Sequence, residues 1–97
     1  NKNLDMLNDL GEDLSGRSKS RLINLNNKIS ETEGLDSSYH IGASYFLKLK
    51  DYQGDFGKLW HYHLEGLLRE YLRGMSDVET KLESLKVAYD NESVSNN

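Results

Sequence analysis

The sequence predicts an all-α fold, a small bundle of about four to five helices, with one candidate extended segment near residues 39–41. The main observation is that apolar residues recur at helical spacing in separate stretches, which capping or breaking residues delimit. Composition is the second, because 36% hydrophobic residues and a net charge of −4 are typical of a globular chain. With 97 residues, we expect one helical domain, 1–97, around one core.

The same composition argues against several classes of function. The negative net charge argues against direct nucleic-acid binding, because the overall field repels phosphate. The absence of cysteine excludes disulfides and thiolate metal sites. No apolar run approaches the roughly 20 residues of a membrane span, so we expect no membrane contact and a cytoplasmic location. Because the chain opens with Asn1, we expect a piece of a longer protein or a processed product.

The first third of the chain contains two predicted helices. Apolar residues keep three-to-four spacing over residues 4–10, although the alternative is a frayed terminus that packs on an upstream partner. Residues 11–16, bounded by glycines, are expected to form a loop. The next helix should begin near Ser18 or Ser20 and end before Gly34.

Three cations, Arg17, Lys19 and Arg21, crowd the predicted start of this second helix. The helix dipole disfavours positive charge there, so an anion nearby would offset them. That anion is a phosphate or an acidic partner surface in the functional interpretation. The simpler alternative is a solvated turn whose charges are screened by salt.

The middle of the chain combines aromatic and apolar residues with glycine. Residues 39–41 look extended, and residues 43–49 are expected to form a short helix after Gly42. The polar run 51–55, which contains Gly54, should close that helix.

The strongest predicted helix covers residues 56–73, around which the rest of the chain is expected to pack. Asp55 precedes it as a candidate N-cap, Arg73 lies in its last turn, and Gly74 follows it. Its apolar stripe contributes most of the expected core, which consists of Leu25, Ile29, Phe46, Leu59, Trp60, Leu64, Leu67, Leu68 and Tyr71.

Ser76 or Asp77 is expected to cap a last helix. Its apolar stripe is formed by Val78, Leu82, Leu85 and Tyr89. Glu83 and Lys86, three residues apart and of opposite sign, are the predicted ion pair on this helix. Residues 90–97 should form a disordered tail, because Val94 is their only apolar residue.

The histidines are the first candidates for chemistry. His61 and His63 point about 200° apart on a helix, so they cannot share a metal ion, and no metal site is expected. His63 falls on the apolar stripe, where a hydrogen-bonded core or interface role is expected, and His61 falls on the polar face. His40 either meets a ligand phosphate or caps backbone carbonyls. None of the three has a recognisable nucleophile partner.

Other catalytic patterns are absent from the sequence. The carboxylates show no spacing typical of an acid/base pair, and the glycines form neither GxGxxG nor GxxxxGK[ST]. We therefore assign no catalytic residue and expect the chain alone to hydrolyse neither GTP nor ATP. The aromatic residues favour a helical core over a base-stacking surface, because most fall on apolar helix faces.

Three stretches together resemble one known family. Residues 39–47, Tyr-His-Ile-Gly-Ala-Ser-Tyr-Phe-Leu, resemble the IGHSYF element of the McrB-type AAA+ NTPases, the GTP-dependent motor subunits of 5-methylcytosine-specific restriction systems. Leu59 and Trp60, with Leu64 and residues 67–72, resemble that family's W…IxPLLEEYF helix. Residues 25–29 are similar to its LNxxI helix. Order and spacing agree from about residue 20 to residue 75, which makes the combined match fairly specific.

The resemblance implies the C-terminal helical lid of an AAA+ module, which follows a P-loop core. Such a lid closes over nucleotide and packs on the next subunit of a ring. The implied nucleotide-proximal residues are Gly42, Ala43, Ser44 and Tyr45. No cofactor is expected in this chain alone, and GTP or ATP with Mg²⁺ is implied for the full-length protein. The implied partners are the protein's own P-loop core, neighbouring ring subunits, a nuclease subunit and, indirectly, DNA.

The chain departs from the family pattern at two positions. Ala43 stands where the family usually has histidine, and Gly66 where it usually has proline. Ser44 occupies about the place of the sensor arginine that AAA+ lids often carry, so the resemblance assigns no catalytic residue either.

The alternative function is an autonomous helical interaction module, in which the 56–72 stripe or the 39–46 aromatics bind a partner helix. A metalloenzyme built on the histidines is the weakest hypothesis.

Overall fold

Helical segments account for the whole architecture of residues 6–92, the part of the chain that the computed structural model describes. The elements in order are η1 (Met6–Leu10), α2 (Glu12–Glu31), η2 (Ser37–Tyr39), η3 (Ala43–Tyr52), α3 (Phe56–Leu59), η4 (Trp60–Leu64), α4 (Glu65–Leu72) and α5 (Val78–Asp90). The segments η1, η2 and η3 are 3-10 helices, and η4 is a π-helical turn. The predicted all-α class is confirmed.

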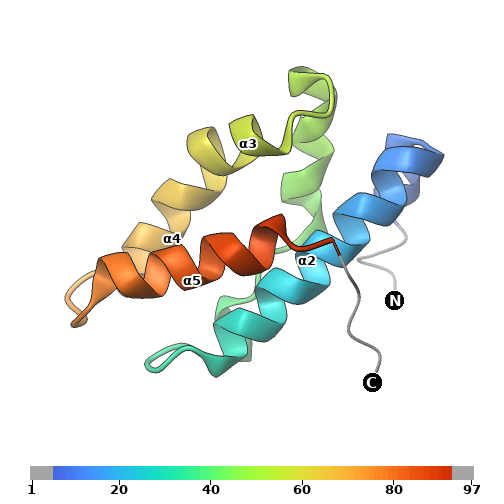
Figure 1. Ribbon diagram of the computed structural model, residues 1–97. Helices are drawn as coiled ribbons and strands as arrows, with labels where there is room; N and C mark the ends of the chain where they lie inside the picture. The colour runs from blue at the N-terminus through green and yellow to red at the C-terminus, as the bar shows by residue number, and fades with distance from the viewer. Residues whose placement is uncertain (1–5, 93–97) are drawn as a thin grey trace.

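The last helix lies between two others. α5 packs along α2 on one side and against α4 on the other, and Figure 1 shows α4 and α5 as a hairpin. The 3-10 helix η3 packs between η1 and α3 and so connects the first helical segment to the start of the central one. Within residues 6–92, no helix is both long and apolar enough to cross a membrane.

The second predicted helix begins earlier than expected. α2 already starts at Glu12, so the predicted loop over residues 11–16 is wrong. Two acidic residues, Glu12 and Asp13, occupy its first turn, where the helix dipole favours negative charge. Gly16 is therefore an interior helix position and not a loop boundary. The predicted end, before Gly34, is confirmed by the last helical residue, Glu31.

The candidate extended segment contains no strand. Tyr39 ends the short helix η2, and only His40 to Gly42 continue in an open conformation before η3 begins. The helix predicted after Gly42 is present, but as a ten-residue 3-10 helix. It ends at Tyr52, and the next residue, Gln53, has a φ of 54°, in the left-handed region.

The central helix runs from Phe56 to Leu72 as α3, η4 and α4. Asp55 caps it, because its carboxylate accepts a hydrogen bond of 3.1 Å from the Lys58 backbone N–H. At its middle, the Glu65 N–H bonds the carbonyl of Trp60, five residues back, and this defines the π turn. The sequence did not predict that turn.

The core forms where these elements meet. Seven of the expected core residues are buried, namely Leu25, Ile29, Phe46, Leu59, Trp60, Leu64 and Leu68. Leu67 and Tyr71 are partly exposed and pack against that core from outside. Tyr89 is fully buried on α5, and its hydroxyl donates a hydrogen bond of 2.6 Å to the carbonyl of Phe56.

The end of α5 differs from the prediction. Lys86 pairs with Asp90 at 2.8 Å rather than with Glu83. Asp90 is still helical, and Glu92 makes ion pairs with α2, so a disordered tail is wrong for residues 90–92. Residues 93–97 of that predicted tail lie outside the described part of the chain.

Exposed Gly66 offers a way to stabilise the fold. It lies in the helix interior, and a Cβ added there would meet nothing within 4 Å. We expect Gly66→Ala to raise the free energy of unfolding by about 0.5 to 1 kcal/mol, because alanine loses less backbone entropy on folding. Urea unfolding of the variant and the parent measures this difference.

Gly34→Ala is the opposing control, since Gly34 has a φ of +92° and its added Cβ would lie 2.9 Å from Met75. It should lower the free energy of unfolding by about 1 kcal/mol. If both alanine variants changed stability in the same direction, the backbone argument would be wrong.

Candidate functional site

The amide of Asn26 holds the open segment between η2 and η3. Its Oδ1 accepts a hydrogen bond of 2.6 Å from the Ile41 N–H, and its Nδ2 donates one of 3.0 Å to the Ile41 carbonyl. One side chain thus satisfies both backbone groups of a buried residue. We call this pair of hydrogen bonds the Asn26 clamp.

A second contact lies one helical turn along α2. Ser30 Oγ and His40 Nε2 are 2.6 Å apart, and Ser30 follows Asn26 by four residues on the same helix face. Successive turns of α2 therefore fasten successive residues of the open segment. His40 thus contacts a serine hydroxyl rather than the backbone carbonyls that it was expected to cap.

The residues predicted to lie near the nucleotide form the turn that follows the Asn26 clamp, and only some of them are exposed. Gly42 and Ser44 are exposed and Tyr45 is half-buried, whereas Ala43 is buried in the core. The Tyr45 N–H donates to the Gly42 carbonyl at 3.2 Å, which begins η3. At Ala43, where the resembled family usually has histidine, a larger side chain would need space that the core occupies.

Tyrosines flank this turn. The Tyr39 and Tyr71 rings meet edge to face with centroids 4.9 Å apart. Burial raises the pKa of the Tyr71 phenol, and the nearby phenols of Tyr45 and Tyr39 raise it further. Tyr71 therefore remains a neutral hydrogen-bonding group at physiological pH.

The other histidines lie on the central helix. His63 Nε2 is 2.7 Å from the Tyr52 hydroxyl, and exposed His61 is 3.8 Å from the carboxylate of Glu65. No group of three or more potential metal ligands occurs within residues 6–92. The hydrogen bond of His63 accounts for its place beside the apolar stripe.

Sequence reasoning missed two groups that the structure brings together. Asn26 was part of a recognised motif, but nothing in its local pattern pointed to Ile41, fifteen residues away. The cations Arg17 and Arg21 have their anion in Glu92, which lies more than seventy residues further along the chain. Polar groups so far apart in sequence leave no periodic signal that would connect them.

Comparison with known families gives one match. The family described as "McrB, alpha-helical lid domain" matches residues 17–79, which include the Asn26 clamp, the Gly42–Tyr45 turn and the central helix. Searches of curated proteins and of solved structures each returned no match to this chain.

Proposed function

Because the chain belongs to the McrB alpha-helical lid family, we propose that it contributes to nucleotide-site closure and ring assembly in a McrB-like AAA+ NTPase. The observation that carries the proposal is the family match over residues 17–79. A lid of this kind works by moving as a unit over a nucleotide that a separate core holds, which requires a firmly held contact segment.

The Asn26 clamp supports this role. It ties the start of the Gly42–Tyr45 turn to α2, the longest helix of the fold. Movement of α2 would therefore carry the turn with it. We propose that the exposed groups of the turn, Gly42 and Ser44, approach the nucleotide when the lid closes and exclude water from it.

The proposal extends to the ligand and partners. GTP or ATP with Mg²⁺ would be held by the P-loop core, since this chain has no glycine loop for phosphates. The partners would be that core, the neighbouring ring subunits and a nuclease subunit, with DNA reached indirectly in the cytoplasm.

The alternative interaction module loses one of its two surfaces. The 56–72 stripe packs inside the bundle, with Phe56, Leu59, Trp60, Leu64, Leu68 and Leu72 all buried, so it is not free for a partner helix.

Combining this chain with a separately made P-loop core, with and without GTP, tests the lid function by size-exclusion chromatography. A nucleotide-dependent complex is expected, and the absence of any complex would contradict the lid role.

Gly42→Val tests the placement of the turn. Gly42 has φ −79° and ψ 150°, an extended conformation that valine adopts, and its added Cβ would meet only Ser44 Oγ at 3.8 Å. We expect the melting curve of this chain to remain unchanged. NTP turnover of the protein that joins this lid to its core should fall about tenfold, because a branched side chain would disturb the closed site.

Gly66→Val is the matched control, since it makes the same change at an exposed helix position. Its turnover should equal that of the parent. Parental turnover in Gly42→Val, with normal folding, would mean that the turn is structural and does not approach the nucleotide.

A further inference from the structure

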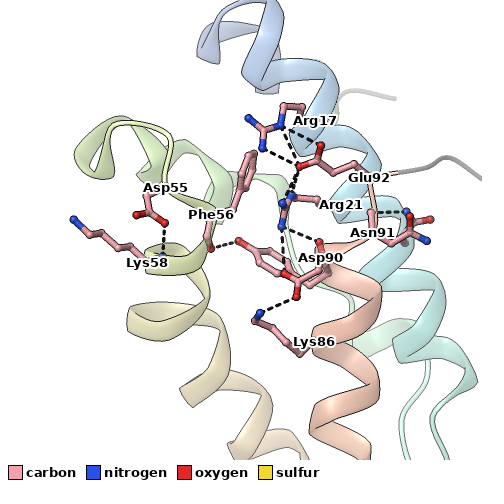
Figure 2. Close-up of polar contacts among 11 residues, drawn as sticks. Arg17, Arg21, Asp55, Phe56, Lys58, Lys86, Asp90, Asn91 and Glu92 are labelled. Atoms are coloured by element: carbon pink, nitrogen blue, oxygen red, sulfur yellow. Dashed lines mark hydrogen bonds and ion pairs between the residues drawn. The ribbon is translucent and has the colours of Figure 1, made fainter.

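Two arginines of α2 converge on one carboxylate. Arg17 and Arg21, four residues apart on one helix face, both bond Glu92, which lies two residues beyond the end of α5 (Figure 2). For Arg17, Nε and Nη2 each lie 3.1 Å from Glu92 Oε2. For Arg21, the corresponding distances are 2.8 Å and 2.7 Å.

Other contacts hold Arg21 independently of Glu92. Its guanidinium lies over the Phe56 ring at 4.1 Å and 5.1 Å from the Tyr89 ring centroid. Its Nη1 also donates to the Tyr89 carbonyl at 3.1 Å, and its side chain is only 11% exposed. Arg17 lies over the same Phe56 ring at 4.8 Å. Arg21 is therefore oriented before any anion binds.

The four donors are concentrated on one oxygen of the Glu92 carboxylate. Four guanidinium nitrogens surround Glu92 Oε2, whereas Oε1 receives one hydrogen bond, of 3.2 Å, from Arg17. One carboxylate oxygen has only two lone pairs to offer. Each arginine presents its Nε and Nη2 edge, the fork that binds two oxygens of one anion. A phosphate group, with three terminal oxygens, would distribute these donors better than one carboxylate.

We propose that Arg17 and Arg21 form a binding site for a phosphate group, and that Glu92 occupies it as an intramolecular stand-in. This site is separate from the Gly42–Tyr45 turn and does not rest on the lid function. The ligand is either free phosphate or the terminal phosphate of a nucleotide. Because Glu92 lies two residues beyond the end of α5, its departure would leave that helix intact.

The surrounding charges determine when the site can bind. Arg17 and Glu92 line a pocket of about 470 Å³ that is open to solvent. The carboxylates of Glu12 and Asp13 line the same pocket. Asp90 lies 3.6 Å from Arg21. These carboxylates oppose a further anion, so a phosphate should bind only when the Glu92 carboxylate has left. The hydrogen bond from Arg17 lowers the pKa of Glu92, which keeps this competing group ionised at neutral pH.

Removing the competing carboxylate provides the test. Inorganic phosphate and ATP are titrated separately into the 97-residue chain and into Glu92→Ala, with the side-chain Nε–H resonances of Arg17 and Arg21 followed by NMR. We expect Glu92→Ala to bind inorganic phosphate about tenfold or more tightly than the parent, since hydrogen bonds to charged groups contribute roughly one such factor each. Binding of ATP with no binding of phosphate would assign the site to nucleotides.

Three variants make the test specific. Glu83→Ala removes the same charge from the exposed face of α5 and should bind like the parent. Arg17→Lys and Arg21→Lys, each combined with Glu92→Ala, should lose the gain in phosphate affinity. Lysine cannot bind two oxygens of one anion with a planar pair of N–H groups as arginine does. Arg17 is 42% exposed, so its variant remains informative if the Arg21 variant fails to fold. Parental affinity of Glu92→Ala for both ligands would overturn the proposal, as would an equal gain in Glu83→Ala.

Discussion

Replacing Trp60 with alanine is expected to lower the free energy of unfolding by about 3 to 5 kcal/mol, a large part of the roughly 5 to 15 kcal/mol of a domain this size. Trp60 is 6% exposed, its ring lies 5.1 Å from that of Tyr89, and Lys86 Nζ lies 5.8 Å from its ring centroid. Alanine would leave a cavity between the central helix and α5 that their backbones cannot close completely. Urea unfolding at neutral pH measures the loss.

Tyr62→Ala is the matched control, because Tyr62 lies in the same π turn but is 60% exposed. It removes a comparable aromatic ring and should change the free energy of unfolding by less than about 1 kcal/mol. A Trp60→Ala variant that unfolds like Tyr62→Ala would show that the Trp60 ring contributes little to the core.

The central helix could be predicted because its signals are local. Its apolar residues recur with the helical period, Asp55 supplies the N-cap, and Gly74 follows its end. The π turn within it could not be predicted, since one wider turn changes the spacing by only one residue. It occurs just before Gly66, where the family usually has proline. Proline has no N–H to donate, so both arrangements interrupt the regular hydrogen bonding of the helix in this region.

The errors at the two ends of the bundle have a common physical cause. Gly16 suggested a loop, yet the packing of α2 against η1 and α5 outweighs the low helix propensity of glycine. Polar Glu92 suggested disorder, yet it is held by two arginines of another helix. In both cases a tertiary contact decides the local structure. The same holds for the turn, because Asn26 of another element holds Ile41 at its start.

Asn26→Asp is expected to lower the free energy of unfolding by about 2 to 3 kcal/mol, because it leaves a buried carbonyl without its donor. The introduced carboxylate can still accept from the Ile41 N–H, but its second oxygen would face the Ile41 carbonyl, now 3.0 Å from Asn26 Nδ2. Two oxygens that both accept repel each other at that distance. Denaturant unfolding quantifies the effect.

Asn27→Asp adds the same charge to the next residue of α2, which is exposed, and should cost less than about 0.5 kcal/mol. The repulsion disfavours the charged form in the folded state, so the pKa of the introduced carboxyl at position 26 should lie above its unfolded value of about 3.9. Its penalty is therefore fully present above that raised pKa and shrinks as the pH falls through it, because the protonated carboxyl can donate to the Ile41 carbonyl. Unfolding of both variants at neutral pH and near pH 4 measures the recovery, with Asn27→Asp correcting for general acid effects. Equal stability of the two variants at neutral pH would mean that the Asn26 clamp does not hold the turn on α2.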